Sequence, residues 1–218
     1  AALLPMVFLL LLGLVDFETG WDWTILEYTE FWTVQGFVRN LFYNGWHPII
    51  PWLSFMLLGI GLSRFDLRER RVQTMMIGLG AGALSLAYAL AFLGRALDPE
   101  LAELLSVSPV PPLPVYMIAG SGAAFVVIGL SLRFFSSGTI GVLAPFVATG
   151  KQTLTLYIAH IMVGMAVLEA LGMIGGQSAE MALLSASLFI IAALIYGTIW
   201  ARFFKAGPIE WLMRRLVG

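Results

Sequence analysis

Long runs without charge are the feature that most limits what this chain can fold into. No charged residue lies between Arg71 and Arg95, and none lies between Glu180 and Arg202. A helix needs about 20 apolar residues to cross a bilayer, because every backbone polar group must be paired within the segment there. Both runs have that length, so the sequence predicts a membrane-spanning helix at each place.

The composition supports this prediction and excludes several other classes of protein. Of the 218 residues, 60% are hydrophobic and 11% are charged, whereas soluble domains carry about 25% charged residues. A net charge of −1 provides no basic field for nucleic acid. The absence of cysteine excludes disulfide bonds, thiolate metal sites and cysteine nucleophiles. We therefore expect an integral membrane protein that is surrounded by lipids and binds no nucleic acid.

Reading between the charges gives about six predicted spans, at residues 1–15, 48–64, 73–94, 114–134, 153–174 and 181–202. The predicted fold is an all-α, polytopic membrane helix bundle that forms one membrane domain over residues 1–218. The first stretch has neither an initiator Met nor the basic segment of a signal peptide. We expect that it is a truncated helix and that part of the protein precedes residue 1.

The basic residues predict the orientation, because they remain on the cytoplasmic side of a membrane. Ten of the twelve fall in connections on one side, and only Arg39 and Arg95 fall on the other. Both ends of the chain are therefore predicted to be cytoplasmic. The ten are Arg64, Arg68, Arg70, Arg71, Arg133, Lys151, Arg202, Lys205, Arg214 and Arg215.

Two segments are predicted to lie outside the spans. The connection 16–47 is acidic and rich in Trp, Tyr and Phe, which suits an outward-facing segment at the headgroup level or a lid over an outward site. Residues 207–217 have apolar side chains at helical spacing and end in basic residues, so they predict a short amphipathic helix on the cytoplasmic leaflet. Within the third span, Gly78 and Gly82 have the spacing that lets two helices approach closely.

The fifth span carries one candidate site. Thr153, Tyr157, His160 and Gly164 are spaced as one helical stripe, and a polar stripe on a span is expected to face the bundle or a water-filled cavity. His160 is the one ionisable residue well inside a predicted span, and Lys151 lies at the inner mouth of the stripe. The histidine is either functional or part of an interhelical hydrogen bond.

His47 is the second candidate, in the stretch YNGWHPIIPW at residues 43–52. An imidazole with an ordinary pKa of about 6.5 can act as a general base at the outer surface, or it can be an ordinary interfacial side chain. The chain has no GxSxG, HExxH or Walker A motif. Two histidines without a thiolate form a weak ligand set, so we predict no metal site.

Three stretches resemble a family of bacterial inner-membrane proteins whose C-terminal region is catalogued as domain of unknown function four hundred and eighteen. They are FYNGWHPIIPWLSFMLLGIGLSR (42–64), GKQTLTLYIAH (150–160) and FFKAGPIEWLMRRL (203–216). The family's characteristic elements are matched here by Gly150, Lys151, Leu154, Thr155 and Tyr157, and by Gly207, Pro208, Glu210, Trp211, Arg214 and Arg215. The resemblance covers most of residues 36–218.

Such proteins are distantly similar to membrane acyltransferases of the heparan-alpha-glucosaminide N-acetyltransferase type. The resemblance implies transfer of an acyl group from cytoplasmic acyl-CoA, as co-substrate rather than permanent cofactor, to an acceptor across the membrane. Lys151, Arg68, Arg70 and Arg71 would then hold the CoA phosphates, while His160 or His47, with Tyr157, would carry the chemistry.

Two other functions remain open from the residues. One is a transporter for a small solute, with an intramembrane histidine relaying protons, although the sequence shows no inverted repeat and no helix pair broken by Gly or Pro. The other is a non-catalytic subunit packed against a membrane-protein partner or a second copy. Of the three hypotheses, only the acyltransferase predicts that the protein binds acyl-CoA in detergent.

Overall fold

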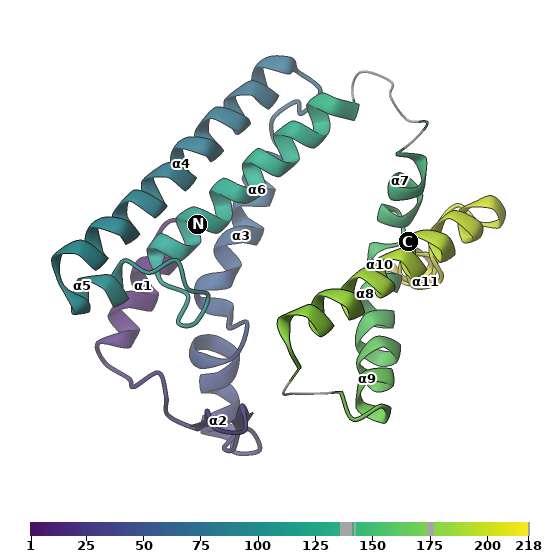
Figure 1. Ribbon diagram of the computed structural model, residues 1–218. Helices are drawn as coiled ribbons and strands as arrows, with labels where there is room; N and C mark the ends of the chain where they lie inside the picture. Colours follow the sequence, from purple (N-terminus) through teal and green to yellow (C-terminus); the bar gives the residue numbers. More distant parts are fainter. Residues whose placement is uncertain (136–140, 142, 174–176, 218) are drawn as a thin grey trace. The chain divides into compact units, whose positions relative to one another are not determined.

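The computed structural model describes residues 1–135, 141, 143–173 and 177–217. Almost every ordered segment in these ranges is a helix, apart from one antiparallel hairpin of two short strands (Figure 1). Contacts divide the chain into two compact units, residues 1–137 and 138–218, and each is described by itself.

The first unit begins with a short helix and the hairpin and continues into longer helices. Its elements are α1 (Leu3–Leu12), β1 (Trp21–Asp22), β2 (Glu27–Tyr28), α2 (Val34–Arg39), the π-helical segment η1 (Asn40–Asn44), α3 (Ile49–Leu62), α4 (Arg70–Leu97), α5 (Pro99–Leu104) and α6 (Pro114–Phe135). The second unit consists of α7 (Ala144–Gly150), α8 (Thr153–Ala159), the π-helical segment η2 (His160–Met165), α9 (Ala166–Ala170), α10 (Ala179–Phe203) and α11 (Pro208–Val217).

Each predicted span coincides with a helical segment, but the helices differ in length. Among the described residues, four are long and apolar enough to cross a membrane, namely Arg70–Leu97, Pro114–Phe135, Thr153–Ala170 and Ala179–Phe203. Helix α3 reaches that length only together with Val34–Asn44, from which it is bent by 45°. The shorter α1 has ten residues, and residue 174, the predicted end of the fifth span, lies outside the described ranges. The count of four or five spans is consistent with a multi-pass membrane protein.

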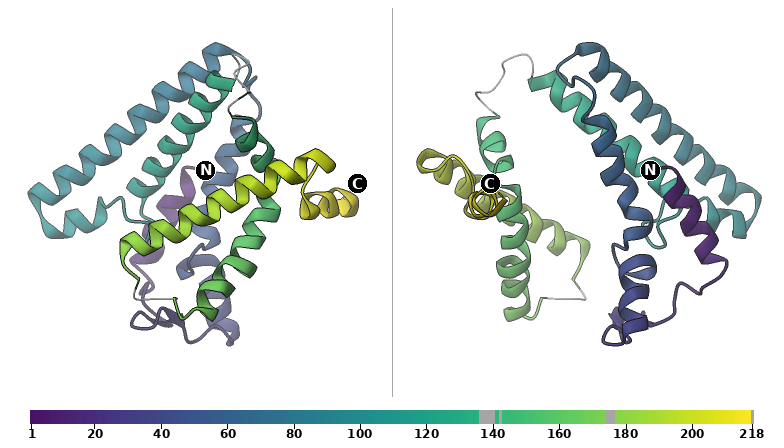
Figure 2. Two further views of the ribbon diagram at one scale, coloured as in Figure 1. Left: turned by 45° about the vertical axis from the view of Figure 1, so that its right-hand side comes forward. Right: turned by 180° about the vertical axis from the view of Figure 1, so that it is seen from behind.

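Helices α4 and α6 lie side by side and form the main packing contact of the first unit (Figures 1 and 2). Gly80 and Gly122 make the close approach, since a Cβ atom on Gly80 would lie 2.6 Å from the carbonyl oxygen of Gly122. Gly78 and Gly82 have open space around their Cα atoms. The close contact between α4 and α6 is therefore made at Gly80, and the prediction of a close helix contact at Gly78 and Gly82 stays untested.

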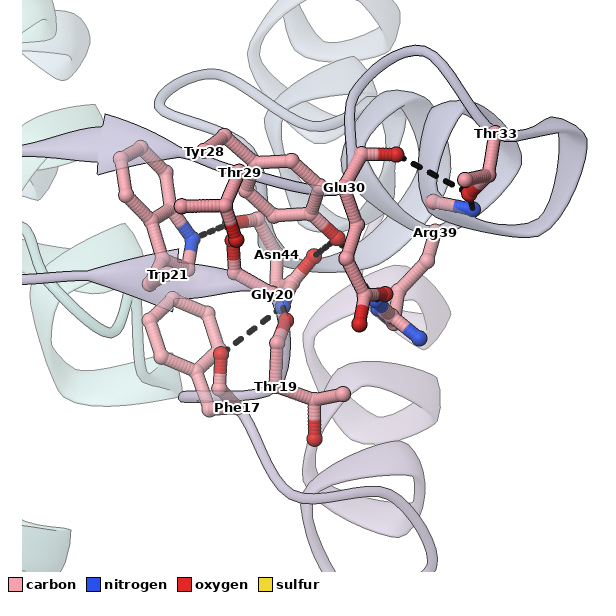
Figure 3. A network of polar contacts seen from close by, with 11 residues as sticks. Phe17, Thr19, Gly20, Trp21, Tyr28, Thr29, Glu30, Thr33, Arg39 and Asn44 are labelled. Atoms are coloured by element: carbon pink, nitrogen blue, oxygen red, sulfur yellow. Dashed lines mark hydrogen bonds and ion pairs between the residues drawn. The ribbon is translucent and has the colours of Figure 1, made fainter.

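The connection 16–47 folds back on itself around the fully buried side chain of Asn44 (Figure 3). The amide nitrogen of Asn44 donates hydrogen bonds to the carbonyl oxygens of Phe17 and Thr19, at 2.8 and 2.9 Å. Its amide oxygen accepts one from the Tyr28 hydroxyl, and its carbonyl oxygen accepts one from the Trp21 indole. Every polar group of Asn44 that the fold buries is thus paired, which fixes the hairpin against η1.

In the second unit, α7 packs against α10, and α11 packs against α8. The α7–α10 contact is close at Gly197, where a Cβ atom would lie 2.6 Å from the Thr149 hydroxyl oxygen. Nearby, the side-chain nitrogen of Gln152 donates a hydrogen bond to the Gly197 carbonyl oxygen at 2.9 Å. These contacts fix the start of α8 against the second half of α10.

Candidate functional site

His160 lies where the fifth predicted span changes its hydrogen-bonding pattern. Helix α8 ends at Ala159, and the π-helical segment η2 starts at His160. Such segments inside helices are frequent at functional sites, because they change which side chains face a neighbouring helix. The imidazole of His160 is half-buried and lies edge-on to the rings of Tyr157 and Phe189, with centroids 5.2 and 6.1 Å away.

The contacts of His160 are with rings rather than with polar groups. Within the ranges that the structure describes, neither imidazole nitrogen makes a hydrogen bond. The interhelical hydrogen bond that would give this histidine a purely structural role is therefore not formed in the second unit.

The predicted stripe is only partly buried in its own unit. Gly164 follows His160 one helical turn later, and both residues are next to Phe189 of α10. Tyr157, by contrast, is 60% exposed and Thr153 is exposed. The first part of the stripe, Thr153 and Tyr157, is therefore exposed, and the second part, His160 and Gly164, faces α10.

Lys151 lines an open hollow of about 450 Å³ at the base of this helix. A second lysine, Lys205, lines the same hollow from the segment that follows α10. The remaining lining residues are apolar, namely Ala144, Val147, Ala148, Ala201 and Phe204. The sequence placed Lys151 at a basic mouth but gave no reason to pair it with Lys205, because 53 residues separate the two.

The three arginines predicted to share this mouth belong to the other unit. Arg70 and Arg71 open α4, and Arg68 lies just before it. All three are exposed. Lys151 lies in the second unit, so a site that these four residues share stays a prediction.

His47 lies in the break between two helices. Residues 45–48 separate Val34–Asn44 from Ile49–Leu62, and the two helices are bent by 45° across them. The imidazole is exposed and lies edge-on to Trp52, with ring centroids 4.6 Å apart. A helix pair broken at Gly45 and Pro48 was not expected from the sequence, which showed one apolar run only after His47.

Two motifs of the family resemblance meet in the second unit. The carboxylate of Glu210 accepts hydrogen bonds from the Thr155 backbone nitrogen, at 3.1 Å, and from the Thr155 hydroxyl. The Ile209 backbone nitrogen donates to the same hydroxyl oxygen at 3.1 Å. We call this arrangement of Thr155, Ile209 and Glu210 the Thr155–Glu210 clasp. It gives both motifs a structural role in attaching α11 to α8.

The clasp shifts the acidity of its carboxylate. Partial burial would raise the pKa of Glu210, but the hydrogen bonds from the Thr155 side chain and backbone outweigh it and bring the pKa below its ordinary value. Glu210 is therefore held as a carboxylate anion. Gly207 lies directly against the clasp, where a Cβ atom would collide with the Glu210 carboxylate and the Thr155 hydroxyl.

Across the described parts of both units, no group of three or more His, Asp or Glu side chains is placed to hold a metal ion. The candidate chemistry therefore lies with His160, Tyr157 and the two lysines of the hollow in the second unit, and with His47 in the first.

The fold and these sites define a helical protein of the multi-pass membrane class. The chain belongs to the family described as "Protein of unknown function (DUF418)", whose model matches residues 61–218. No curated protein and no solved structure matches the chain.

Proposed function

We propose that the protein is a membrane acyltransferase that takes an acyl group from cytoplasmic acyl-CoA and passes it to an acceptor across the membrane. One observation carries the proposal. The imidazole of His160 is half-buried without a hydrogen bond, on a helix that begins beside a hollow lined by two lysines. An imidazole of this kind can accept a proton, and lysines attract the phosphates of a thioester donor.

The proposed reaction uses His160 as a general base. The acceptor's hydroxyl or amine loses its proton to the imidazole while its oxygen or nitrogen bonds to the acyl carbon. The carbon–sulfur bond then breaks, and the CoA thiolate leaves and recovers the proton. Tyr157, whose ring contacts His160, would orient the imidazole. Lys151 would hold the CoA phosphates, with Arg68, Arg70 and Arg71 adding positive charge on the cytoplasmic side.

The proposal includes six crossings of a bacterial inner membrane, with both ends of this chain in the cytoplasm. The distribution of arginine and lysine supports this orientation. In it, α11 lies flat on the cytoplasmic leaflet, with Arg214 and Arg215 toward lipid phosphates. On the opposite side, His47 would face the acceptor.

Transfer from a labelled acyl-CoA in sealed proteoliposomes tests the proposal. Replacing His160 by Ala is expected to lower the rate by about 100-fold or more, the usual contribution of a general base. His47→Ala tests the outer histidine in the same assay. Met162→Ala is the matched control, because Met162 is an exposed residue of the same π-helical segment. Undiminished transfer in both histidine variants would refute histidine chemistry.

A second candidate function, proton-coupled transport of a small solute, is favoured by the break at residues 45–48. Transporters place their substrates at discontinuous helices, where unpaired backbone groups and side chains meet. Here the break carries His47, which can exchange a proton. Uptake driven by a pH gradient, in a protein that does not bind acyl-CoA, would select this function over acyl transfer.

A further inference from the structure

We infer that the hollow between α7 and the end of α10 binds a phosphate group through Lys151 and Lys205. The chemistry is that of a phosphate ester attached to an apolar or extended group. A phospholipid headgroup and CoA both provide it, so the inference holds whether or not the protein transfers acyl groups.

The end of α7 and the segment after α10 bring the two lysines to the same hollow. One wall consists of Ala144, Val147, Ala148 and Lys151, which follow one face of α7 at i, i+3, i+4 and i+7. The other wall consists of Ala201 in the last turn of α10 and of Phe204 and Lys205 in the non-helical segment that follows it. The last lining residue of each wall is therefore a lysine. The small side chains of the three alanines leave space between the walls.

The segment that carries Lys205 is fixed by its neighbours. The Trp200 indole nitrogen donates a hydrogen bond to the Ala206 carbonyl oxygen at 3.0 Å, so it spans Lys205. The Trp200 and Phe204 rings are stacked with centroids 4.3 Å apart. Two residues beyond Lys205, Gly207 lies against the Thr155–Glu210 clasp. A lysine on such a fixed segment loses less entropy when it binds an anion.

The opposite wall is fixed in a similar way. The Gln152 side-chain nitrogen donates to the carbonyl oxygen of Gly197, and Thr149 packs against Gly197 where a Cβ atom would not fit. Lys151 lies between Thr149 and Gln152 in the chain, so its backbone is held on both sides. Contacts within the second unit thus hold the backbone of both walls of the hollow.

The charge of the hollow is not balanced by protein carboxylates. No Asp or Glu lines it, and the ion pair found among the described residues joins Arg39 to Glu30 in the first unit. Lys151 is the C-cap residue of α7 and Lys205 lies two residues beyond α10, but a helix end offers only about half a negative charge. Two full positive charges thus remain, and a phosphate would neutralise them.

Two probes test the inference on the purified protein in detergent. Native mass spectrometry measures retention of phosphatidylglycerol against phosphatidylcholine, and calorimetry measures binding of CoA. Lys151→Gln and Lys205→Gln are each expected to weaken binding of the phosphate probe about fivefold, the usual effect of one lysine near anionic lipid. Arginine at either position is expected to retain binding, because it keeps the charge.

Arg202→Gln is the matched control, since Arg202 is an exposed cation of the last turn of α10 that does not line the hollow. Ala201→Phe fills the hollow while keeping both lysines, and it should also weaken binding. Lysine-dependent retention of the lipid assigns a lipid site, and lysine-dependent binding of CoA assigns a donor site. If the double glutamine variant binds both probes as the wild type does, or if Arg202→Gln weakens binding equally, the inference is wrong.

The binding experiment and the acyl-transfer assay can fail independently. A protein that binds phosphate through the two lysines but shows no transfer from acyl-CoA would refute the proposed function and leave the phosphate site standing.

Discussion

Asn44 shows how one buried amide determines the structure of a long connection. Its side chain is fully buried and donates to two carbonyl oxygens. Asn44→Asp keeps the shape but replaces the donor by an oxygen, so both carbonyl groups lose their partner and a carboxyl group is buried. We expect a loss of about 3 kcal/mol in the free energy of unfolding, the scale for unsatisfied buried groups.

Denaturant unfolding followed by tryptophan fluorescence measures this loss, because Trp21 bonds directly to Asn44. Asn40→Asp is the control, since Asn40 belongs to the same π-helical segment and its side chain makes no hydrogen bond within the described residues. Equal losses in the two variants would show that the network around Asn44 does not hold the connection.

Glu210 predicts a pH dependence of the attachment of α11. Because its pKa is lowered in the folded protein, the clasp contributes its full stability above the ordinary pKa of 4.5 and loses it as the pH falls through the lowered value. Glu210→Gln is expected to cost about 2 kcal/mol at neutral pH, where the charged hydrogen bonds are intact. The difference from wild type should shrink as the pH falls below 4.5.

Thermal unfolding of both proteins over this pH range measures the difference. Glu103→Gln is the control, because Glu103 is exposed. A difference between wild type and Glu210→Gln that stays constant into the acid range would contradict the clasp.

At the same residue scale, the sequence could predict single groups but not their partners. His160 is evident as an ionisable residue inside an apolar run, and Lys151 as a charge at its mouth. Lys205 has no distinguishing feature in the sequence, and only the packing of α10 against α7 brings it near Lys151. Thr155 and Glu210 are visible in the motifs, but they lie 55 positions apart, and no local pattern indicates that they bond.

At the scale of the helices, the α4–α6 contact predicts that alanine is tolerated at some glycines of α4 and not at another. Gly80→Ala is expected to destabilise the protein by about 1–3 kcal/mol, since the added methyl group would overpack against Gly122 and Val126. Gly78→Ala and Gly82→Ala place the same methyl group in open space. They should be neutral or stabilising by up to about 1 kcal/mol, because Ala favours helix over Gly.

Unfolding in a mixed detergent with increasing denaturant compares the three variants. If Gly78→Ala were as damaging as Gly80→Ala, the face of α4 that meets α6 would be different from the one described.

The helices themselves were largely predictable, and their irregularities were not. Uncharged runs determine α4, α6 and α10 to within a few residues, because charges cannot enter the hydrocarbon core. The π-helical segments η1 and η2 depend on hydrogen bonds shifted by one residue, which hydropathy does not detect. The break at residues 45–48 was missed for a related reason, since aromatic residues before it were interpreted as a surface connection.

For the whole molecule, the family match and the long apolar helices agree with what the sequence predicted, a multi-pass helical membrane protein. The alternation of basic and acidic connections predicts orientation from charge alone, and the absence of cysteine makes that orientation measurable. Any single engineered cysteine is the only thiol in the chain, so its reaction with a membrane-impermeant reagent reports the side from which it is reached.

Labelling of a cysteine at position 157 tests the central claim of the proposed function, that cytoplasmic acyl-CoA reaches the region of His160. Tyr157 contacts His160 and is exposed within its unit. In inside-out vesicles, we expect Tyr157→Cys to react with an impermeant thiol reagent and to be protected by acyl-CoA, whereas Met162→Cys should not be protected. Reaction only from the outer side, or none from either side, would contradict the account.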